Sequence, residues 1–324
     1  MASLGLTLEQ MLHSLSVMGF EPVLITPNSP RDATRQIHYY IESGIPVILS
    51  LTYPDDKAHA VTVIGHSIDV TASFCINERF FPDREGTPQP RSFCRSSDLI
   101  SYFLVQDDDG GPFRKLYLQN TGVEPKDGEP PIPCPAILKG HYDPQQGPHP
   151  LLSAILVPFP LSVLLDGETA EERAISFVGS TTALAGAPIP NPTVVRTFLQ
   201  LSNSYKEQWG TDEGRPVCVG RHIRKHLLSK WIWITEVADA KGLFPKRRAI
   251  GEVIQDAASY AVQIDTESLK DFLLIHMPRF MSIFFPDGTI KSLPGVVYDD
   301  YPLLNQSTER TLSLQHQEAI PVPK

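Results

Sequence analysis

The 324-residue sequence has few cysteines, fewer basic than acidic residues and no long hydrophobic run. Its four cysteines stand far apart without CxxC spacing, which predicts neither a zinc site nor a disulfide framework and is typical of a reducing compartment. The 28 basic and 37 acidic residues give a formal net charge of −9. Neither nucleic acid nor an anionic membrane is therefore expected as a partner, because both select for basic surfaces.

Two further absences concern membranes and export. The longest apolar stretch, residues 151–165, is interrupted by Pro158 and Pro160, so it does not predict a membrane span. The N-terminal residues lack the basic and apolar regions of a secretory signal. We therefore expect a cytoplasmic protein, and the 41% of apolar and 20% of charged residues are typical of a globular fold.

The first 120 residues contain the patterns of two helices and several strands. Thr7 and Gln10 form a capping box ahead of a helix over 7–18, and a second helix over 28–44 ends at Gly44. Apolar runs predict four strands, over 21–26, 46–52, 59–65 and 101–107. Residues 72–98, rich in charge and proline, are expected to form a surface insertion. We interpret residues 1–120 as the first domain.

The rest of the chain predicts a second domain of the same class. Residues 121–150 are rich in proline and glycine and are expected to form a linker. The second domain, over 151–305, begins with a strand, and Asn191 caps a predicted helix over 191–209. Further strands predict an antiparallel meander: 231–237, 249–257, 260–265, 272–277 and 281–289. The tail, 306–324, is expected to be disordered. The predicted fold class is α+β for both domains.

Two residues at strand ends are the candidates for catalysis. His59 opens one predicted strand and Asp107 closes a later one, so the two side chains meet at one sheet edge if these strands are antiparallel neighbours. A carboxylate bound to one imidazole nitrogen leaves the other nitrogen to accept a proton from a nucleophile. The alternative is a structural histidine bonded to a backbone carbonyl and a turn-capping aspartate, with Asp108 and Asp109 competing for any role.

The segments GIPVILSL, HAVTVIGH and YFLVQDDDGGPF resemble the second half of papain-like cysteine peptidases. They are most similar to the bacteriocin-processing (double-glycine leader) peptidase-like branch, and the resemblance covers residues 1–120. It implies a papain-like half-domain with an antiparallel sheet, in which His59 is the general base and Asp107 orients it. It also implies hydrolysis of peptide or amide bonds through thiolate attack, oxyanion stabilisation and breakdown of an acyl-enzyme by water.

The sequence departs from this family at the nucleophile. In the family, a cysteine at the start of a long helix lies upstream of the histidine, whereas here no cysteine precedes His59. We therefore expect that the nucleophile segment is missing and that the protein is inactive or truncated, because nothing is present to attack the substrate. Cys75 and Cys94 follow the His59 strand, and both are better explained as structural thiols.

Three other groups of polar residues are weaker candidates. His66 lies an odd number of positions after His59, which places it on the other face of a regular strand, and we interpret it as structural. His222 and His226 have the i, i+4 spacing of a metal pair, but the basic residues around them favour a solvated face.

The third group is acidic and belongs to the second domain. Glu236, Glu252 and Asp256 lie on predicted strands and are candidates for a metal or general-acid site. The alternative for these carboxylates is ion pairing with the basic residues 246–248.

The leading hypothesis is therefore a cysteine peptidase-like protein that lacks an evident nucleophile. The alternative is a non-catalytic module that binds a peptide or protein in the former cleft, and a metal-dependent enzyme centred on the acids of the second domain is a third hypothesis. A peptide or protein is the expected substrate or partner, and neither a cofactor nor a metal ion is predicted.

Overall fold

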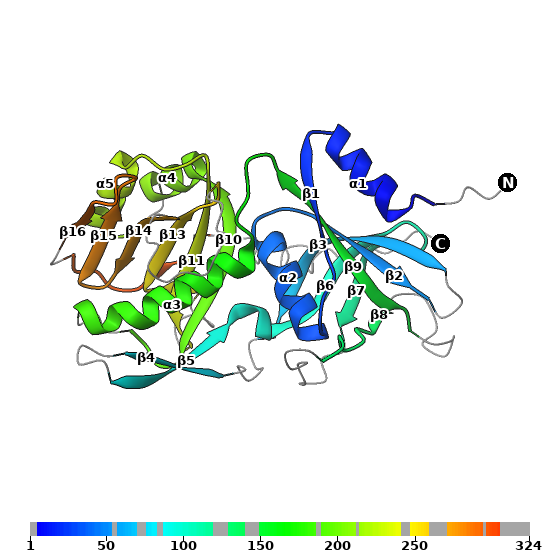
Figure 1. Ribbon diagram of the computed structural model, residues 1–324, viewed down its shortest axis with the longest axis horizontal. Helices are drawn as coiled ribbons and strands as arrows, with labels where there is room; N and C mark the ends of the chain where they lie inside the picture. Colours follow the sequence, from blue (N-terminus) through cyan, green and yellow to red (C-terminus); the bar gives the residue numbers. More distant parts are fainter. Residues whose placement is uncertain are drawn as a thin grey trace, which may run out of the picture. The chain divides into compact units, whose positions relative to one another are not determined.

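The computed structural model describes residues 5–53, 57–69, 76–82, 87–118, 129–139, 149–185, 189–211, 214–240, 247–258, 271–293 and 296–304. Their contacts divide them into two compact units. Unit 1 comprises the described residues up to Asp69 and Ile100–Leu161, and unit 2 comprises those between 76 and 99 and between 162 and 304. Each unit combines helices with a mainly antiparallel sheet, which confirms the predicted α+β class (Figure 1).

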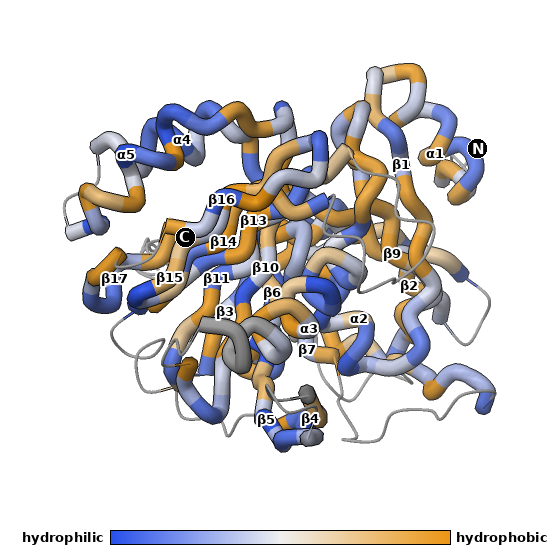
Figure 2. The backbone as a smooth tube through the Cα atoms, turned by 60° about the vertical axis from the view of Figure 1, so that its left-hand side comes forward, coloured by the Kyte–Doolittle hydropathy of each residue, from blue (hydrophilic) through white to orange (hydrophobic). Residues whose placement is uncertain are grey.

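Unit 1 is built around a seven-stranded antiparallel sheet with the order β1-β9-β2-β3-β6-β7-β8. The backbone tube of β2 and β9, two inner strands of this sheet, is mostly hydrophobic (Figure 2). The strands are β1 (Phe20–Ile25), β2 (Val47–Thr52), β3 (Ala58–Ile68), β6 (Ile100–Asp107), β7 (Gly111–Leu118), β8 (Ala136–Lys139) and β9 (Leu151–Pro160).

The helices of unit 1 begin and end where the sequence predicts. α1 (Leu8–Val17) has a complete capping box, in which Gln10 N donates to Thr7 Oγ1 at 3.2 Å and Thr7 N donates to Gln10 Oε1 at 2.9 Å. α2 (Pro30–Glu42) is capped by Ser29 and is followed by Gly44 at a φ of +73°. α2 lies against β2, β3, β7 and β9, and its buried residues cover that part of the sheet.

The boundary between the two units differs from the sequence prediction. β9, expected to open the second domain, pairs with both β1 and β2 and is therefore an inner strand of unit 1. Its residues 154–159 are buried without alternation, which requires neighbours on both faces and both edges. Within the predicted linker 121–150, β8 pairs with β7, so this part of it completes the sheet of unit 1.

The predicted surface insertion 72–98 is also placed differently. β4 (Asn77–Pro82) and β5 (Pro88–Arg95) form a hairpin, and β5 runs parallel to β10 in the sheet of unit 2. A short 3₁₀ helix, η1 (Ser96–Leu99), follows. Unit 2 therefore consists of two separate stretches of the chain. The prediction of a surface insertion was wrong because β4 and β5 contribute the buried side chains of Phe81 and Phe93 to a hydrophobic cluster of unit 2.

Unit 2 has an eight-stranded sheet with the order β16-β15-β14-β13-β11-β10-β5-β4 and a separate pair, β12 with β17. Its other strands are β10 (Thr193–Leu201), β11 (Trp231–Asp239), β12 (Arg248–Ala249), β13 (Gly251–Asp256), β14 (Phe272–Met277), β15 (Phe280–Phe284), β16 (Ile290–Ser292) and β17 (Tyr301–Pro302). Its helices are α3 (Gly167–Ala185), α4 (Ser202–Thr211) and α5 (Val217–Lys225).

Two hydrophobic clusters lie on opposite faces of this sheet. One includes Val194 and Phe198 of β10 together with residues of α4 and α5, and the other includes Val195 of the same strand together with residues of α3. The alternation along β10 shows why this segment is a strand. No helix in the described part of the chain is long and apolar enough to cross a membrane.

The prediction of a helix over 191–209 was wrong for the first half of this segment. Residues 193–201 form β10, and only the following α4 is helical. The stretch Thr193–Thr197 is rich in β-branched residues, whose preference for strands outweighs the capping signal of Asn191. The predicted strand 260–265 and the predicted tail 306–324 lie outside the described residues.

Candidate functional site

The structure brings His59 and Asp107 together. β3 and β6 are antiparallel neighbours, so the beginning of β3 lies beside the end of β6. His59 Nε2 is 2.9 Å from Asp107 Oδ1. The expected juxtaposition is thus present where β3 begins and β6 ends.

Asp107 is held firmly in this position. Its side chain is 1% exposed, and Oδ1 also accepts hydrogen bonds from the backbone N–H groups of Asp109 and Gly110 at 3.0 and 3.1 Å. Arg114 Nη1 donates to Oδ2. Burial raises the pKa of Asp107, but the hydrogen bonds from His59, Gly110 and Arg114 outweigh this effect and lower the pKa below its ordinary value. The carboxylate is therefore ionised at neutral pH and fixed in orientation.

His59 differs from Asp107 in being accessible. Its side chain is 17% exposed, and Nδ1 is 3.6 Å from Asp109 Oδ2, which is longer than a hydrogen bond. Asp108 and Asp109 are both 87% exposed. The three residues His59, Asp108 and Asp109 offer ligand atoms within 4.8 Å of one another, but two exposed carboxylates are a common surface arrangement. Nδ1 is the ring nitrogen that remains available for proton transfer.

The described cysteines do not complete this site. Cys134 of unit 1 is buried, and burial together with the charge of Asp32 raises the pKa of its thiol to about 12. Cys94 belongs to a hydrophobic core cluster of unit 2, as expected of a structural thiol, and Cys218 is exposed on α5 of the same unit. Cys75 lies outside the described residues. A thiolate is the attacking species in cysteine hydrolases, and Cys134 does not provide one at neutral pH.

His66 lies on a different face of β3 from the one predicted. The register with β6 changes between Val63, which pairs with Val105, and Gly65, which pairs with Leu104, so β3 contains one extra residue at Ile64. Beyond this bulge His66 pairs with Phe103, which faces the same way as Val105. The prediction that His59 and His66 lie on opposite faces, made from their odd spacing, was therefore wrong, because a bulge shifts every following side chain to the opposite face.

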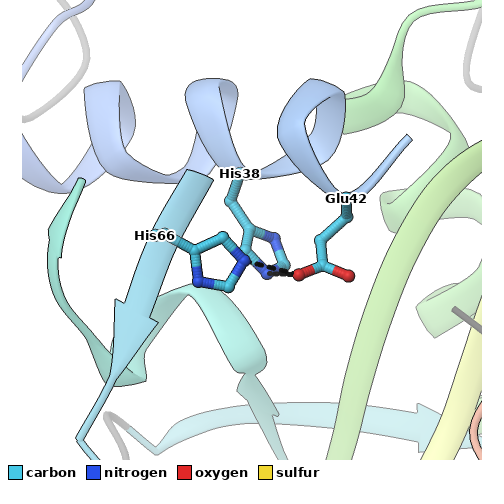
Figure 3. A group of neighbouring side chains, drawn as sticks. All are labelled: His38, Glu42 and His66. Atoms are coloured by element: carbon cyan, nitrogen blue, oxygen red, sulfur yellow. Dashed lines mark hydrogen bonds and ion pairs between the residues drawn. The ribbon is translucent and has the colours of Figure 1, made fainter. Parts of the chain in front are cut away.

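The bulge brings His66 to a cluster that sequence reasoning missed. His38 and Glu42, four positions apart on α2, point toward His66 of β3 (Figure 3). His66 Nε2 is 2.6 Å from Glu42 Oε1, and His38 Nε2 is 3.8 Å from the same oxygen. The available signal was the i, i+4 spacing of His38 and Glu42 on one helix face.

The acidic residues of unit 2 are paired, but with partners that were not expected. Glu236 and Glu252 are opposite each other on β11 and β13. Glu236 Oε2 accepts from Arg196 Nε at 2.7 Å, and Glu252 Oε2 accepts from Tyr205 Oη at 2.6 Å. Burial raises the pKa of Glu236, the charge of Arg196 lowers it and the charge of Glu252 raises it, and the net effect is upward.

Of the predicted basic partners of these acids, Arg248 has a different acidic partner. Arg248 pairs with Asp300, and Lys246 lies outside the described residues. Asp256 accepts a hydrogen bond from Ala258 N at 2.9 Å and thereby closes a turn. The three acids do not converge on one point, because the sheet register separates Asp256 from the pair formed by Glu236 and Glu252.

His222 and His226 do not form a metal pair in the described structure. α5 ends at Lys225, and His226 is its C-cap residue with extended backbone. Burial lowers the pKa of His226, and its ring packs edge-on against Phe285. Neither histidine belongs to a group of three potential metal ligands among the described residues.

Comparisons with models of protein families, with curated proteins and with solved structures find no match to this chain.

Proposed function

We propose that unit 1 is a papain-like hydrolase unit in which His59 is the general base, Asp107 orients it and a peptide is the substrate or partner. The observation that carries this proposal is the 2.9 Å contact between His59 Nε2 and Asp107 Oδ1. A buried ionised carboxylate combined with an accessible imidazole is the arrangement that general-base catalysis requires.

The proton would move along a short path. Asp107 accepts the hydrogen bond from Nε2–H of His59, which leaves the lone pair of Nδ1 free. A nucleophile that approaches Nδ1 transfers its proton there as it attacks the acyl carbon, and the imidazolium that forms is stabilised by the Asp107 carboxylate. The imidazolium then returns the proton to the leaving amine. Arg114 contacts the other carboxylate oxygen and keeps Asp107 ionised throughout.

The one described thiol of unit 1, that of Cys134, favours a second candidate function. Because the raised pKa of Cys134 keeps this thiol protonated, the described part of unit 1 provides a base without an attacking cysteine thiolate. The second candidate is a non-catalytic module that binds a peptide beside His59 without cleaving it. In both cases His59 contacts the bound peptide and Asp107 orients His59.

One set of probes tests both candidates on the full chain. Fluorescent peptides with a C-terminal vinyl sulfone, including peptides that end in two glycines, are incubated with wild-type protein and with H59Q, D107N and H13Q. Reversible binding is measured by fluorescence anisotropy and covalent labelling by intact mass. H13Q is the matched control, because His13 is an exposed histidine on α1.

A hydrolase is expected to show covalent labelling that falls by at least about 100-fold in H59Q and is unchanged in H13Q. Mapping the labelled residue would identify the nucleophile. A binding module is expected to show reversible binding that weakens in H59Q and D107N, without labelling. Absence of both, or binding and labelling that are the same in H59Q and the wild type, would overturn the proposal.

A further inference from the structure

The cluster of His38, Glu42 and His66 lies in the core of unit 1. The side chains of the three residues are 2%, 0% and 1% exposed, respectively. His38 and Glu42 come from the last turns of α2, and His66 comes from β3 beneath this helix, so the cluster connects two elements that pack on each other (Figure 3). We propose that this cluster is a binding site for a divalent transition metal ion, with zinc as the preferred ion.

The donor set fits such an ion. Two imidazole nitrogens and one carboxylate oxygen are ligands that Zn²⁺ accepts, whereas Ca²⁺ and Mg²⁺ prefer sites made of oxygen atoms. All three residues offer a ligand atom within 4.8 Å of the others. Three protein ligands leave one position of a tetrahedral zinc ion for a water molecule.

The distances are close to those that coordination requires. With metal–ligand bonds of about 2.05 Å, neighbouring ligand atoms of a tetrahedral zinc site are about 3.3 Å apart. The separation of 2.6 Å between His66 Nε2 and Glu42 Oε1 has to open by about 0.7 Å, and the separation of 3.8 Å between His38 Nε2 and Glu42 Oε1 has to close by about 0.5 Å. Each of these changes is smaller than about 1 Å.

Charge and burial give the second argument. The three side chains are almost fully removed from water, and the buried carboxylate of Glu42 would balance part of the charge of a divalent cation held between it and two neutral imidazoles. The strand partner of His66, Phe103, is also buried, so water is excluded from this side of the cluster as well. The His66 ring presents Nε2 to Glu42, and its Nδ1 has no hydrogen-bond partner among the described residues.

A bound ion would link α2 to β3 and so stabilise the folded unit. The test uses the full-length protein after treatment with a chelator. We expect it to bind one equivalent of Zn²⁺ with an increase in Tm, and to bind one equivalent of Co²⁺ with the visible absorption of a tetrahedral site. The E42Q and H66Q variants are expected to bind Zn²⁺ at least about 100-fold more weakly, because losing one of three ligands exceeds the 10- to 100-fold cost of losing an outer-shell partner.

Two controls locate the site. H13Q removes an exposed histidine, and the double variant D108N/D109N removes the carboxylates beside His59, so both are expected to bind Zn²⁺ as the wild type does. Binding that is lost in D108N/D109N and kept in H66Q would overturn the proposal. So would folded wild-type protein that retains no Zn²⁺ after gel filtration.

A measurement on the wild type covers the case in which a buried variant does not fold. Ring-nitrogen NMR signals of the histidines are followed during addition of Zn²⁺ up to one equivalent. The proposal requires the signals of two histidines to change together, with those of His59 unaffected. Changes confined to His59, or no change at all, would show that the cluster is a hydrogen-bonded triad without a metal.

Discussion

His59 Nε2 and Asp107 Oδ1 are 2.9 Å apart, although 48 positions separate the two residues in the sequence. The carboxylate is buried and accepts two further hydrogen bonds from the backbone and one from Arg114, whereas the ring is partly exposed. The pair therefore joins a rigid acceptor to an accessible base.

Replacing Asp107 by asparagine is expected to destabilise unit 1. The amide keeps the size of the side chain but removes the charge that pairs with Arg114, at a cost of about 2–3 kcal/mol in the free energy of unfolding. Urea denaturation measures this change. D108N is the control, because Asp108 is 87% exposed, and its effect is expected within about 0.5 kcal/mol. Equal stability of D107N and D108N would contradict the prediction.

The lowered pKa of Asp107 predicts a defined dependence of stability on pH. A carboxyl group whose pKa is lower in the folded state stabilises the protein above its unfolded-state pKa of about 4, and this contribution is lost as the pH falls through the folded-state pKa. R114M removes one cause of the lowered pKa. Its deficit in the free energy of unfolding, relative to the wild type, is therefore expected to be largest above about pH 5 and to shrink below about pH 4.

A substitution at Gly110 tests the same contact between Arg114 and Asp107 without replacing either residue. A Cβ atom added at Gly110 would overlap the Arg114 side chain, whose flexible end can move away at the cost of its contact with Asp107. G110A is therefore expected to displace Arg114 from Asp107 and to reproduce the pH dependence of R114M. Denaturation curves between pH 3 and 7 provide the measurement. A deficit that stays constant across this range in both variants would be inconsistent with the assigned role of Arg114.

The described cysteines are expected to differ in their reaction with iodoacetamide. Cys218 is exposed and should be alkylated first, whereas Cys94 is buried and the pKa of Cys134 is raised to about 12, so both should be protected in the native protein. In urea all three should react. Peptide mass spectrometry after short exposures measures the order, and native labelling of Cys134 as fast as that of Cys218 would refute the assignment.

Two glycines of unit 2 are expected to respond to alanine in opposite directions. A Cβ atom at Gly251, on the inner strand β13, would overlap Met277 and the backbone oxygen of His276, so G251A should cost about 2–3 kcal/mol. At Gly210 of α4 the nearest atoms, in the Arg224 side chain, are 3.6 Å away, and G210A should stabilise the protein by about 0.5–1 kcal/mol. Thermal or urea unfolding of the two variants measures the contrast.

Local signals account for the parts of the fold that the sequence predicted well. The Thr7–Gln10 capping box, the cap at Ser29 and the helix end at Gly44 each depend on residues a few positions apart. The contact between His59 and Asp107 was also predictable, because it needs only two antiparallel strands that are neighbours. Segment 193–201 shows the limit of such signals, since a capping residue favoured a helix there and β-branched residues formed a strand.

What the sequence by itself determined is the helices of unit 1, many of the strands and the positions of the two residues at strand ends, because propensity, capping and alternation act over a few residues. Only the tertiary structure decided that β9 belongs to unit 1, that β4 and β5 belong to unit 2, and that His66 faces Glu42. The reason is that strand pairing and the bulge at Ile64 depend on which distant segments meet. One extra residue in a strand is invisible in the sequence, yet it changes the face of every side chain that follows.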